Sequence, residues 1–151
     1  MAIFTEQEAQ ALLKKVLAFS KADECECNLE GSITGNIRYA RNTVSTSGEV
    51  SDVTLAVQSS FGKRTGTATI NEFDDVSLEK VVRRSEELAK LAPENPEYMP
   101  LLGPADYEKV DAWRDSTASM TPEDRARMSD ASITPSKKSK MVAAGFLRDT
   151  K

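Results

Sequence analysis

The stretch DVTLAVQSSF at residues 52–61, followed by Gly62-Lys63 and then RTGTATIN at residues 64–71, decides the fold. Apolar and polar residues alternate in the first segment, and this period of two is typical of a half-buried strand. A glycine at the first position of a two-residue loop suits a tight β-hairpin. The second segment is rich in threonine, which favours extended backbone. Together the two segments predict an antiparallel hairpin.

Alternation of apolar and polar residues predicts three further short strands upstream, at residues 23–30, 33–41 and 43–46. Gly35 marks a weak point or a bulge in the second of them. Turn-forming residues are expected to end each strand in turn: Gly31-Ser32, Asn42 and Ser47-Gly48. Five short strands joined by tight turns predict an antiparallel meander.

A helix is expected on each side of the meander. Thr5 and Glu8 have the spacing of a capping box, which predicts a helix over residues 6–19. Asp74 is a candidate cap for a second helix, whose apolar stripe runs from Leu78 to Ala92. The order helix, five-stranded meander, helix predicts an α+β domain over residues 1–92.

Beyond this domain the composition changes. Residues 93–104 contain four of the six prolines, which predicts an extended linker. In the remaining residues, 105–151, Thr121-Pro122 is a strong helix start, and Pro135 is expected to end that helix. Thr134-Pro135 is a candidate start for a second helix. Gly145 is a candidate for the glycine that follows a helix C-terminus. We therefore expect residues 105–151 to form a helical tail, which is the start of a second region that the sequence does not complete.

The chain has 151 residues, no histidine and a formal net charge of −4. Without histidine it cannot form a Ser-His-Asp triad, a Cys-His dyad or a histidine-ligated zinc site. The acidic balance argues against a general electrostatic contact with nucleic acid, which is not an expected partner. No apolar run reaches the roughly 20 residues of a membrane helix, and no secretory signal pattern is present. We therefore expect a cytoplasmic protein with no membrane contact.

Few residue patterns in the chain suggest chemistry. Cys25 and Cys27 lie two residues apart on one strand face, where small apolar core residues are the ordinary interpretation. No third cysteine or histidine is available to complete a metal site, so no catalytic and no metal-binding residue is assigned. Arg38, Arg41 and Asn42 lie at a strand end and could contact a peptide or a partner protein. An ordinary place on a solvated surface explains them equally well.

The run from Ile37 to Tyr107 resembles the N-terminal domain of the TldD/PmbA proteins, also called the modulator of DNA gyrase family or peptidase family U62. The similarity includes the element Arg38-Tyr39-Ala40-Arg41-Asn42, with Arg41 where asparagine is common. It continues in further motifs that the family shares: Gly62 and Gly66 of the hairpin, the helix start at Asp74, the prolines Pro93 and Pro96, and Ala143-Ala144-Gly145.

The resemblance implies a function that this chain could serve only in part. TldD-like proteins are about three times as long and are similar to zinc metallopeptidases with a His-Glu-x-x-x-His helix in a central domain. The chain contains neither that motif nor any histidine. We therefore expect an inactive N-terminal portion without a cofactor, with zinc only in the missing part of a full-length TldD-like protein.

Two roles follow from the resemblance. In the first, the domain supports dimerisation with a TldD- or PmbA-like subunit and the access of unfolded peptide to the protease. The alternative is a regulatory protein-interaction module, of the DNA gyrase modulator or toxin–antitoxin type, without peptidase activity.

Overall fold

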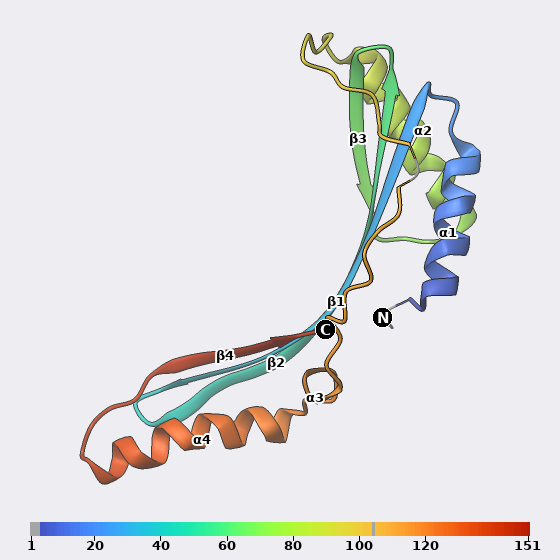
Figure 1. Ribbon diagram of the computed structural model, residues 1–151. Coiled ribbons are helices and arrows are strands. Elements are labelled where there is room, and N and C mark those ends of the chain that lie inside the picture. Colours follow the sequence, from blue (N-terminus) through green and yellow to red (C-terminus); the bar gives the residue numbers. More distant parts are fainter. Residues whose placement is uncertain (1–3, 104) are drawn as a thin grey trace. The chain divides into compact units, whose positions relative to one another are not determined.

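The computed structural model describes residues 4–103 and 105–151. Within these residues the α+β class is confirmed (Figure 1). Along the described part of the chain, one helix precedes the first three strands of an antiparallel sheet, and three helices follow them. The elements follow in the order α1 (Glu6–Phe19), β1 (Glu24–Ala40), β2 (Thr43–Phe61), β3 (Arg64–Ile70), α2 (Asp75–Leu91), α3 (Asp115–Ala118), α4 (Pro122–Lys138) and β4 (Gly145–Thr150). The sheet has four strands in the order β3-β2-β1-β4.

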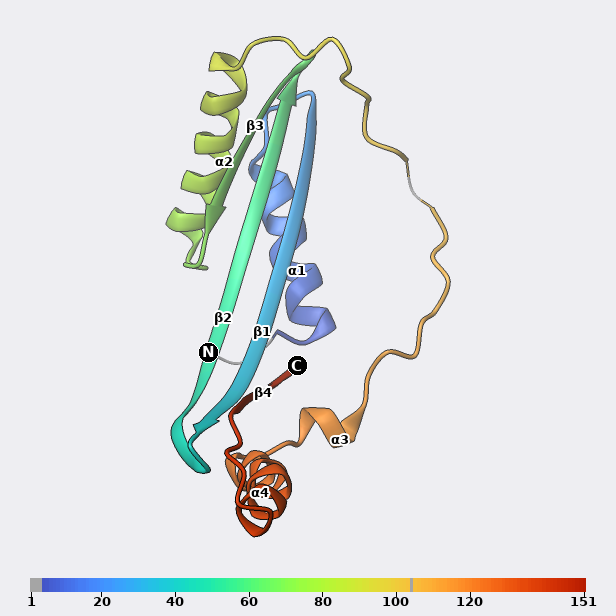
Figure 2. The same cartoon turned by 90° about the vertical axis from the view of Figure 1, so that its left-hand side faces the viewer.

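The prediction of a five-stranded meander is wrong, because two of the expected turns do not form. β1 continues through Gly31-Ser32 and β2 continues through Ser47-Gly48, so both are long single strands, as Figure 2 shows. The hydroxyl of Ser47 donates to the carbonyl of Asn36 in the neighbouring strand at 3.2 Å, which ties this turn-prone residue into the sheet. Pairing between long strands thus overrides local turn preference.

The other two predicted turns are confirmed. Arg41 and Asn42 join β1 to β2 with φ angles of 53° and 62°, a left-handed pair that suits a two-residue hairpin. Gly62, with φ 57°, begins the second tight turn, between β2 and β3.

The chain divides into two compact units that share the strands β1 and β2. Unit 1 comprises the described residues of Met1–Gly31 and Asp52–Glu108, and unit 2 comprises Ser32–Ser51 and Lys109–Lys151. Residues 1–3 of the predicted first domain and Pro104 at the end of the predicted linker lie outside the described residues.

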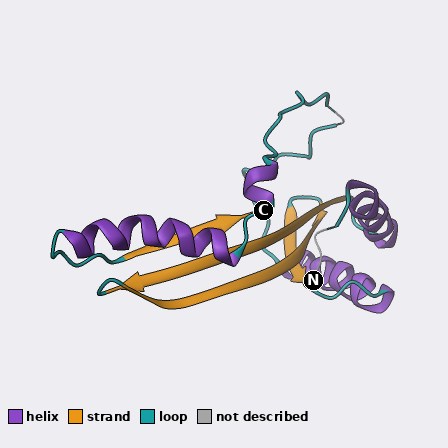
Figure 3. Ribbon diagram, turned by 90° about the horizontal axis from the view of Figure 1, so that it is seen from below, coloured by secondary structure: helices purple, strands orange, loops and turns teal. Residues whose placement is uncertain are grey.

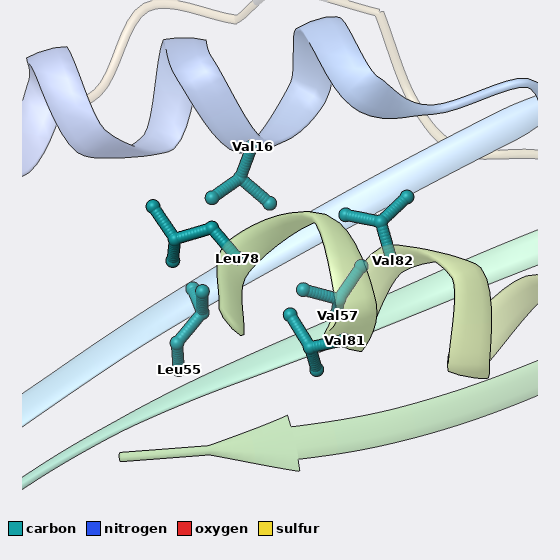
Figure 4. Packing of buried hydrophobic residues seen from close by; sticks show 6 residues of the cluster. All are labelled: Val16, Leu55, Val57, Leu78, Val81 and Val82. Carbon is teal, nitrogen blue, oxygen red and sulfur yellow. The ribbon is translucent and has the colours of Figure 1, made fainter. Parts of the chain in front are cut away.

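The core of unit 1 lies between its two helices and the sheet. Six side chains, each at most 4% exposed, form it: Val16 of α1, Leu55 and Val57 of β2, and Leu78, Val81 and Val82 of α2 (Figure 4). Burial of each such side chain stabilises the fold by about 1.5–3 kcal/mol. The core explains why the apolar periodicity of these three segments predicts their structure correctly.

Both helices of unit 1 begin where the capping residues predict. The hydroxyl of Thr5 accepts from the backbone N–H of Glu8, whose carboxylate accepts from the backbone N–H of Thr5 at 2.8 Å, so the capping box is complete. The carboxylate of Asp74 accepts from the backbone N–H groups of Val76 and Ser77 at 3.1 Å. These bonds satisfy backbone donors that a helix N-terminus leaves free.

Unit 2 contains α4 alongside the β1–β4 part of the sheet (Figure 3). Ile133 of α4 packs with Tyr39 of β1 and with Ala143, and all three are buried. The helix begins as predicted, with Thr121 as its cap and Pro122 at its first position. The element that follows it in the described tail is a strand, β4, which no sequence pattern predicted.

The predicted end of α4 is wrong, since the helix passes through Pro135 to Lys138. Pro135 lies one turn from the helix end, so its missing N–H removes one hydrogen bond, and the residue that would have accepted it, Ala131, is exposed. Lys140, with φ 56°, occupies the left-handed position beyond the helix. The backbone N–H groups of Lys140 and Met141 donate to earlier carbonyls in a Schellman motif.

Gly145 is therefore not the residue that follows the helix C-terminus but the first residue of β4. A Cβ atom at Gly145 would lie 2.4 Å from the phenol oxygen of Tyr39, its register partner in β1. Close packing rather than a helix end requires glycine there.

Residues 93–103 form neither helix nor strand. They are tied to unit 1 by the backbone N–H of Asn95, which donates to the carbonyl of Lys63 at 2.9 Å, and by the phenol of Tyr98, which donates to the Glu24 carboxylate. No helix among the described residues is long and apolar enough to cross a membrane.

Candidate functional site

The three predicted contact residues lie at the β1–β2 turn of unit 2, and the structure gives them different surroundings. Arg38 is exposed on β1, and Arg41 is exposed in the turn itself. Asn42 instead connects the β1–β2 turn to the segment before β4. Its side-chain amide donates to the carbonyl of Met141 at 2.8 Å, and its side-chain oxygen accepts from the backbone N–H of Ala143 at 2.6 Å. Arg38 and Arg41 remain available for an external contact.

Arg38 borders a groove on the sheet surface beside β4. In the β1–β4 register Arg38 lies opposite Phe146, and Asn36 lies opposite Arg148. Paired residues of neighbouring strands share a face, so these four side chains lie on one surface. The groove measures about 460 Å³ and is lined by Arg38, Tyr39, Ala40, Ala144, Gly145 and Phe146.

The chemistry of this surface suits binding rather than catalysis. The ring of Phe146 is 58% exposed, and two guanidinium groups, Arg38 and Arg148, occupy the same face. Guanidinium groups bind carboxylates and backbone carbonyls, and an exposed aromatic ring offers apolar contact. Among the described residues no three acidic, cysteine or histidine side chains gather as a metal site would require.

The opposite face of the same strands is supported by a buried arginine that the sequence analysis did not identify. The side chain of Arg125, from α4, is 2% exposed and donates to the Asp149 carboxylate of β4 at 2.8 Å. Glu49 of β2 lies 3.7 Å away, and the Nε of Arg125 has no hydrogen-bond partner among the residues that the structure describes.

The place of Arg125 explains Gly35, which the sequence singled out as a weak point. A Cβ atom at Gly35 would lie 1.9 Å from the guanidinium, so Arg125 occupies the space that any larger residue would fill. A glycine within a strand can mark such a close approach. That signal was available in the sequence, but it does not say which residue approaches.

Cys25 and Cys27 lie half-buried on β1 in unit 1 and pack against its core, as the sequence interpretation expects. The Cys27 thiol forms a hydrogen bond with the Cys25 sulfur, which lowers the pKa of Cys25 to about 6 although burial opposes the shift. The same bond and burial raise the pKa of Cys27. One thiolate, on Cys25, is therefore expected at neutral pH.

This pairing predicts how Cys25 reacts. Because only the thiolate is nucleophilic, alkylation of Cys25 by iodoacetamide should rise with pH through a midpoint of about 6. Cys27→Ala removes the hydrogen bond, and the midpoint should then move up towards about 8.5. Mass spectrometry of the alkylated protein measures both profiles, with Cys25→Ala as the control. A midpoint that Cys27→Ala leaves unchanged would contradict the pairing.

The described structure thus defines a class of protein: an α+β domain whose sheet carries two helices in unit 1 and α4 in unit 2. Residues 25–89 match the family model of PmbA/TldA metallopeptidase domain 1. The match confirms that this segment resembles the first domain of the PmbA/TldD proteins, as its motifs predict.

Solved structures share the fold over nearly the whole chain. The crystal structure of TldE from Thermococcus kodakarensis gives a TM-score of 0.74 at 14% identity, over 94% of this chain and 37% of that one. A structure from Bacteroides thetaiotaomicron described as a modulator of DNA gyrase gives 0.74 at 12% identity, over 98% and 40%. A structure from Thermotoga maritima with the same description gives 0.72 at 14% identity, over 94% and 33%.

The chain therefore spans between 33% and 40% of the length of these three structures. At such low identity the likeness shows the fold and not the activity. No protein with curated function matches the chain.

Proposed function

We propose that this chain serves as a non-catalytic N-terminal domain of a TldD/PmbA-type zinc metallopeptidase. The observation that carries the proposal is the match of residues 25–89 to domain 1 of this family in a chain that has no histidine. Zinc and the catalytic groups would then belong to other domains of a full-length, cytoplasmic protein. The role left to this domain is to bind a partner subunit and to guide unfolded peptide.

The groove beside Arg38 supports this role. An extended peptide presents backbone carbonyls and carboxylates that the guanidinium groups of Arg38 and Arg148 can bind, and apolar side chains that Phe146 can contact. A TldD- or PmbA-like subunit, in a homo- or heterodimer, would offer the same chemistry through a surface loop. Either use requires the exposure that Arg38 and Phe146 have.

A regulatory protein-interaction module is the second candidate. The observation in its favour is the description of two similar structures as modulators of DNA gyrase. Such a module would use the same groove for one folded partner and would bind unfolded peptide no better than any acidic protein does.

We expect the purified chain to cleave no unfolded protein and to bind no stoichiometric zinc. The physical reason is the absence of histidine together with a single pair of thiols, since a structural zinc site takes four ligands. Incubation with fluorescein-labelled casein measures cleavage, and elemental analysis after dialysis against zinc measures the metal. One tightly held zinc per chain, or cleavage that persists after repurification, would contradict the proposal.

Binding of the same labelled casein, measured by fluorescence anisotropy, tests whether the groove binds unfolded peptide. Arg38→Glu should weaken binding about tenfold, the equivalent of one lost charge-assisted hydrogen bond of about 1.4 kcal/mol. Arg127→Glu, an exposed arginine of α4 outside the groove, is the matched control and should leave binding unchanged. Equal binding by both variants would remove the groove from the proposed function and favour the regulatory module.

A further inference from the structure

The outer edge of β3 in unit 1 is an unpaired strand edge. β3 lies at one end of the sheet and pairs with β2 in the register Phe61↔Arg64 through Leu55↔Ile70. Within the described part of the chain no other strand lies beyond it. Such an edge presents backbone donors and acceptors that can pair with another chain.

The register decides which residues of β3 present those groups. A two-residue hairpin makes Phe61 and Arg64 a hydrogen-bonded pair, and hydrogen-bonded and non-bonded pairs alternate along an antiparallel ladder. Ser60 and Thr65 are thus a non-bonded pair, and the carbonyl of Ser60 indeed accepts from Asp23 on the other side, at 3.0 Å. The N–H and C=O groups of Thr65, Thr67 and Thr69 therefore point away from β2.

A groove runs between this edge and α2. It measures about 240 Å³, and its apolar part consists of Ala68 and Ile70 of β3 with Val81 of α2. Lys80 and Arg84, both exposed, line the α2 side, and Glu72 lies at one end. Arg84 also forms an exposed ion pair with Glu87 at 3.4 Å, a contact that contributes little and can be exchanged.

We propose that an extended, acidic peptide segment binds here by adding a strand to β3. Its backbone would pair with the outward groups of Thr65, Thr67 and Thr69. Alternate side chains would enter the groove, with methylene groups over Ala68 and Ile70 and carboxylates at the cations of α2. Strand addition beside a flanking helix is a recurrent mode of peptide recognition, in which backbone bonds give affinity and the groove gives selectivity.

Charge distinguishes this occupant from a second copy of the chain. The sequence of β3 is RTGTATI, so its one charged residue is Arg64 and it contains no carboxylate. A second β3 paired to the first would bring no negative charge to Lys80 and Arg84 and would add a further cation. The complementary partner is a strand with acidic residues at alternate positions.

This inference does not depend on the proposed function. The edge of β3 belongs to unit 1, whereas the groove beside Arg38 belongs to unit 2. Failure of strand addition would leave the casein experiment on Arg38 unaffected, and the reverse also holds.

The test adds an octapeptide of alternating Thr and Glu to the full chain. The amide chemical shifts of the protein report the binding. The peptide should shift the amides of Thr65, Thr67 and Thr69 and bind at least about tenfold more tightly than the matched Thr and Lys peptide. Thr67→Pro removes one outward N–H and blocks the edge, and proline is tolerated at such an edge position. It should abolish these shifts, whereas Thr67→Val should keep them.

Two further arms keep the test decisive. The Thr and Glu peptide with alternate N-methyl groups needs no protein variant and should not bind, because it lacks the donors for β3. The pair Lys80→Glu and Arg84→Glu should remove the preference for the acidic peptide, while Lys14→Glu on α1 should retain it. Chemical-shift changes away from β3, or equal binding of both peptides, would overturn the proposal. So would changes at β3 that grow with protein concentration in the absence of peptide, which would favour a second copy of the chain as the occupant.

Discussion

Replacement of Gly66 by valine should destabilise unit 1 by about 3 kcal/mol or more, the largest loss we expect from one added side chain. A Cβ atom at this buried position would lie 2.1 Å from the backbone N of Ala89 and 2.5 Å from the carbonyl O of Ser85. Both atoms belong to the backbone of α2, so no side-chain rotation can relieve the overlap. The helix would have to move away from β3 and open the core around Val81 and Val82.

Urea unfolding measures this effect as a lower transition midpoint. Gly103→Val is the matched control, because a Cβ atom at Gly103 would meet nothing within 4 Å and the residue lies outside helices and strands. Amide hydrogen exchange would show the loss of protection in α2 and β3. If Gly66→Val unfolded at the same urea concentration as Gly103→Val, the close contact between β3 and α2 would be refuted.

Removal of the Asp149 carboxylate should cost unit 2 a comparable amount, about 3–5 kcal/mol. Among the described residues, Asp149→Ala would leave the buried guanidinium of Arg125 with Glu49, at 3.7 Å, as its one carboxylate, and its Nε has no hydrogen-bond partner there. A buried charge without its counterion is far costlier than a buried pair. β4 should detach from β1 as a result.

The matched substitution is Glu49→Ala, which removes the outer and 57% exposed carboxylate and should cost less than about 1 kcal/mol. The double variant Arg125→Met and Asp149→Leu removes both charges together and should recover most of the lost stability. Exchange of the β4 amides reports on unit 2 alone. Equal losses of stability from Asp149→Ala and Glu49→Ala would show that Asp149 is not the main counterion of the buried guanidinium.

Local signals predict the helices of this chain well. Thr5, Asp74 and Thr121 each cap the helix that the sequence assigns to them, because a cap depends on residues only three positions away. The tight turn at Gly62 is predicted for the same reason. Residues close in sequence contain all the information that these features need.

The sheet is predicted less well, because its strands depend on distant partners. Ser47 and Gly48 have the composition of a turn, yet the bond from Ser47 to Asn36 spans eleven residues and keeps the backbone extended. β4 pairs with residues more than a hundred positions earlier, and no nearby signal marks it as a strand. The helix through Pro135 likewise persists because tertiary packing of Ile133 outweighs one lost hydrogen bond.

The candidate site shows the same division. The place of Arg38 at a strand end predicts an external contact, and the structure leaves Arg38 exposed beside a groove. The sequence does not predict its neighbours Phe146 and Arg148 as contact residues, because its pattern places them after a helix and not in a strand. The sequence predicts an external contact for Asn42 as well, but the structure shows its side chain hydrogen-bonded to the backbone of Met141 and Ala143.

The division of unit 2 between two separate segments has a consequence for synthesis on the ribosome. The hairpin of Ser32–Ser51 emerges early, whereas β4 is made only after more than ninety further residues. At about 5–20 residues per second, the β4-facing edge of β1 waits on the order of 5–20 s for its partner. During that interval the nascent chain carries an open strand edge in which Ile37 and Tyr39 have neither α4 nor β4 to cover them. The rate at which the ribosome translates residues 52–144 thus sets how long this part of the fold is exposed to wrong partners.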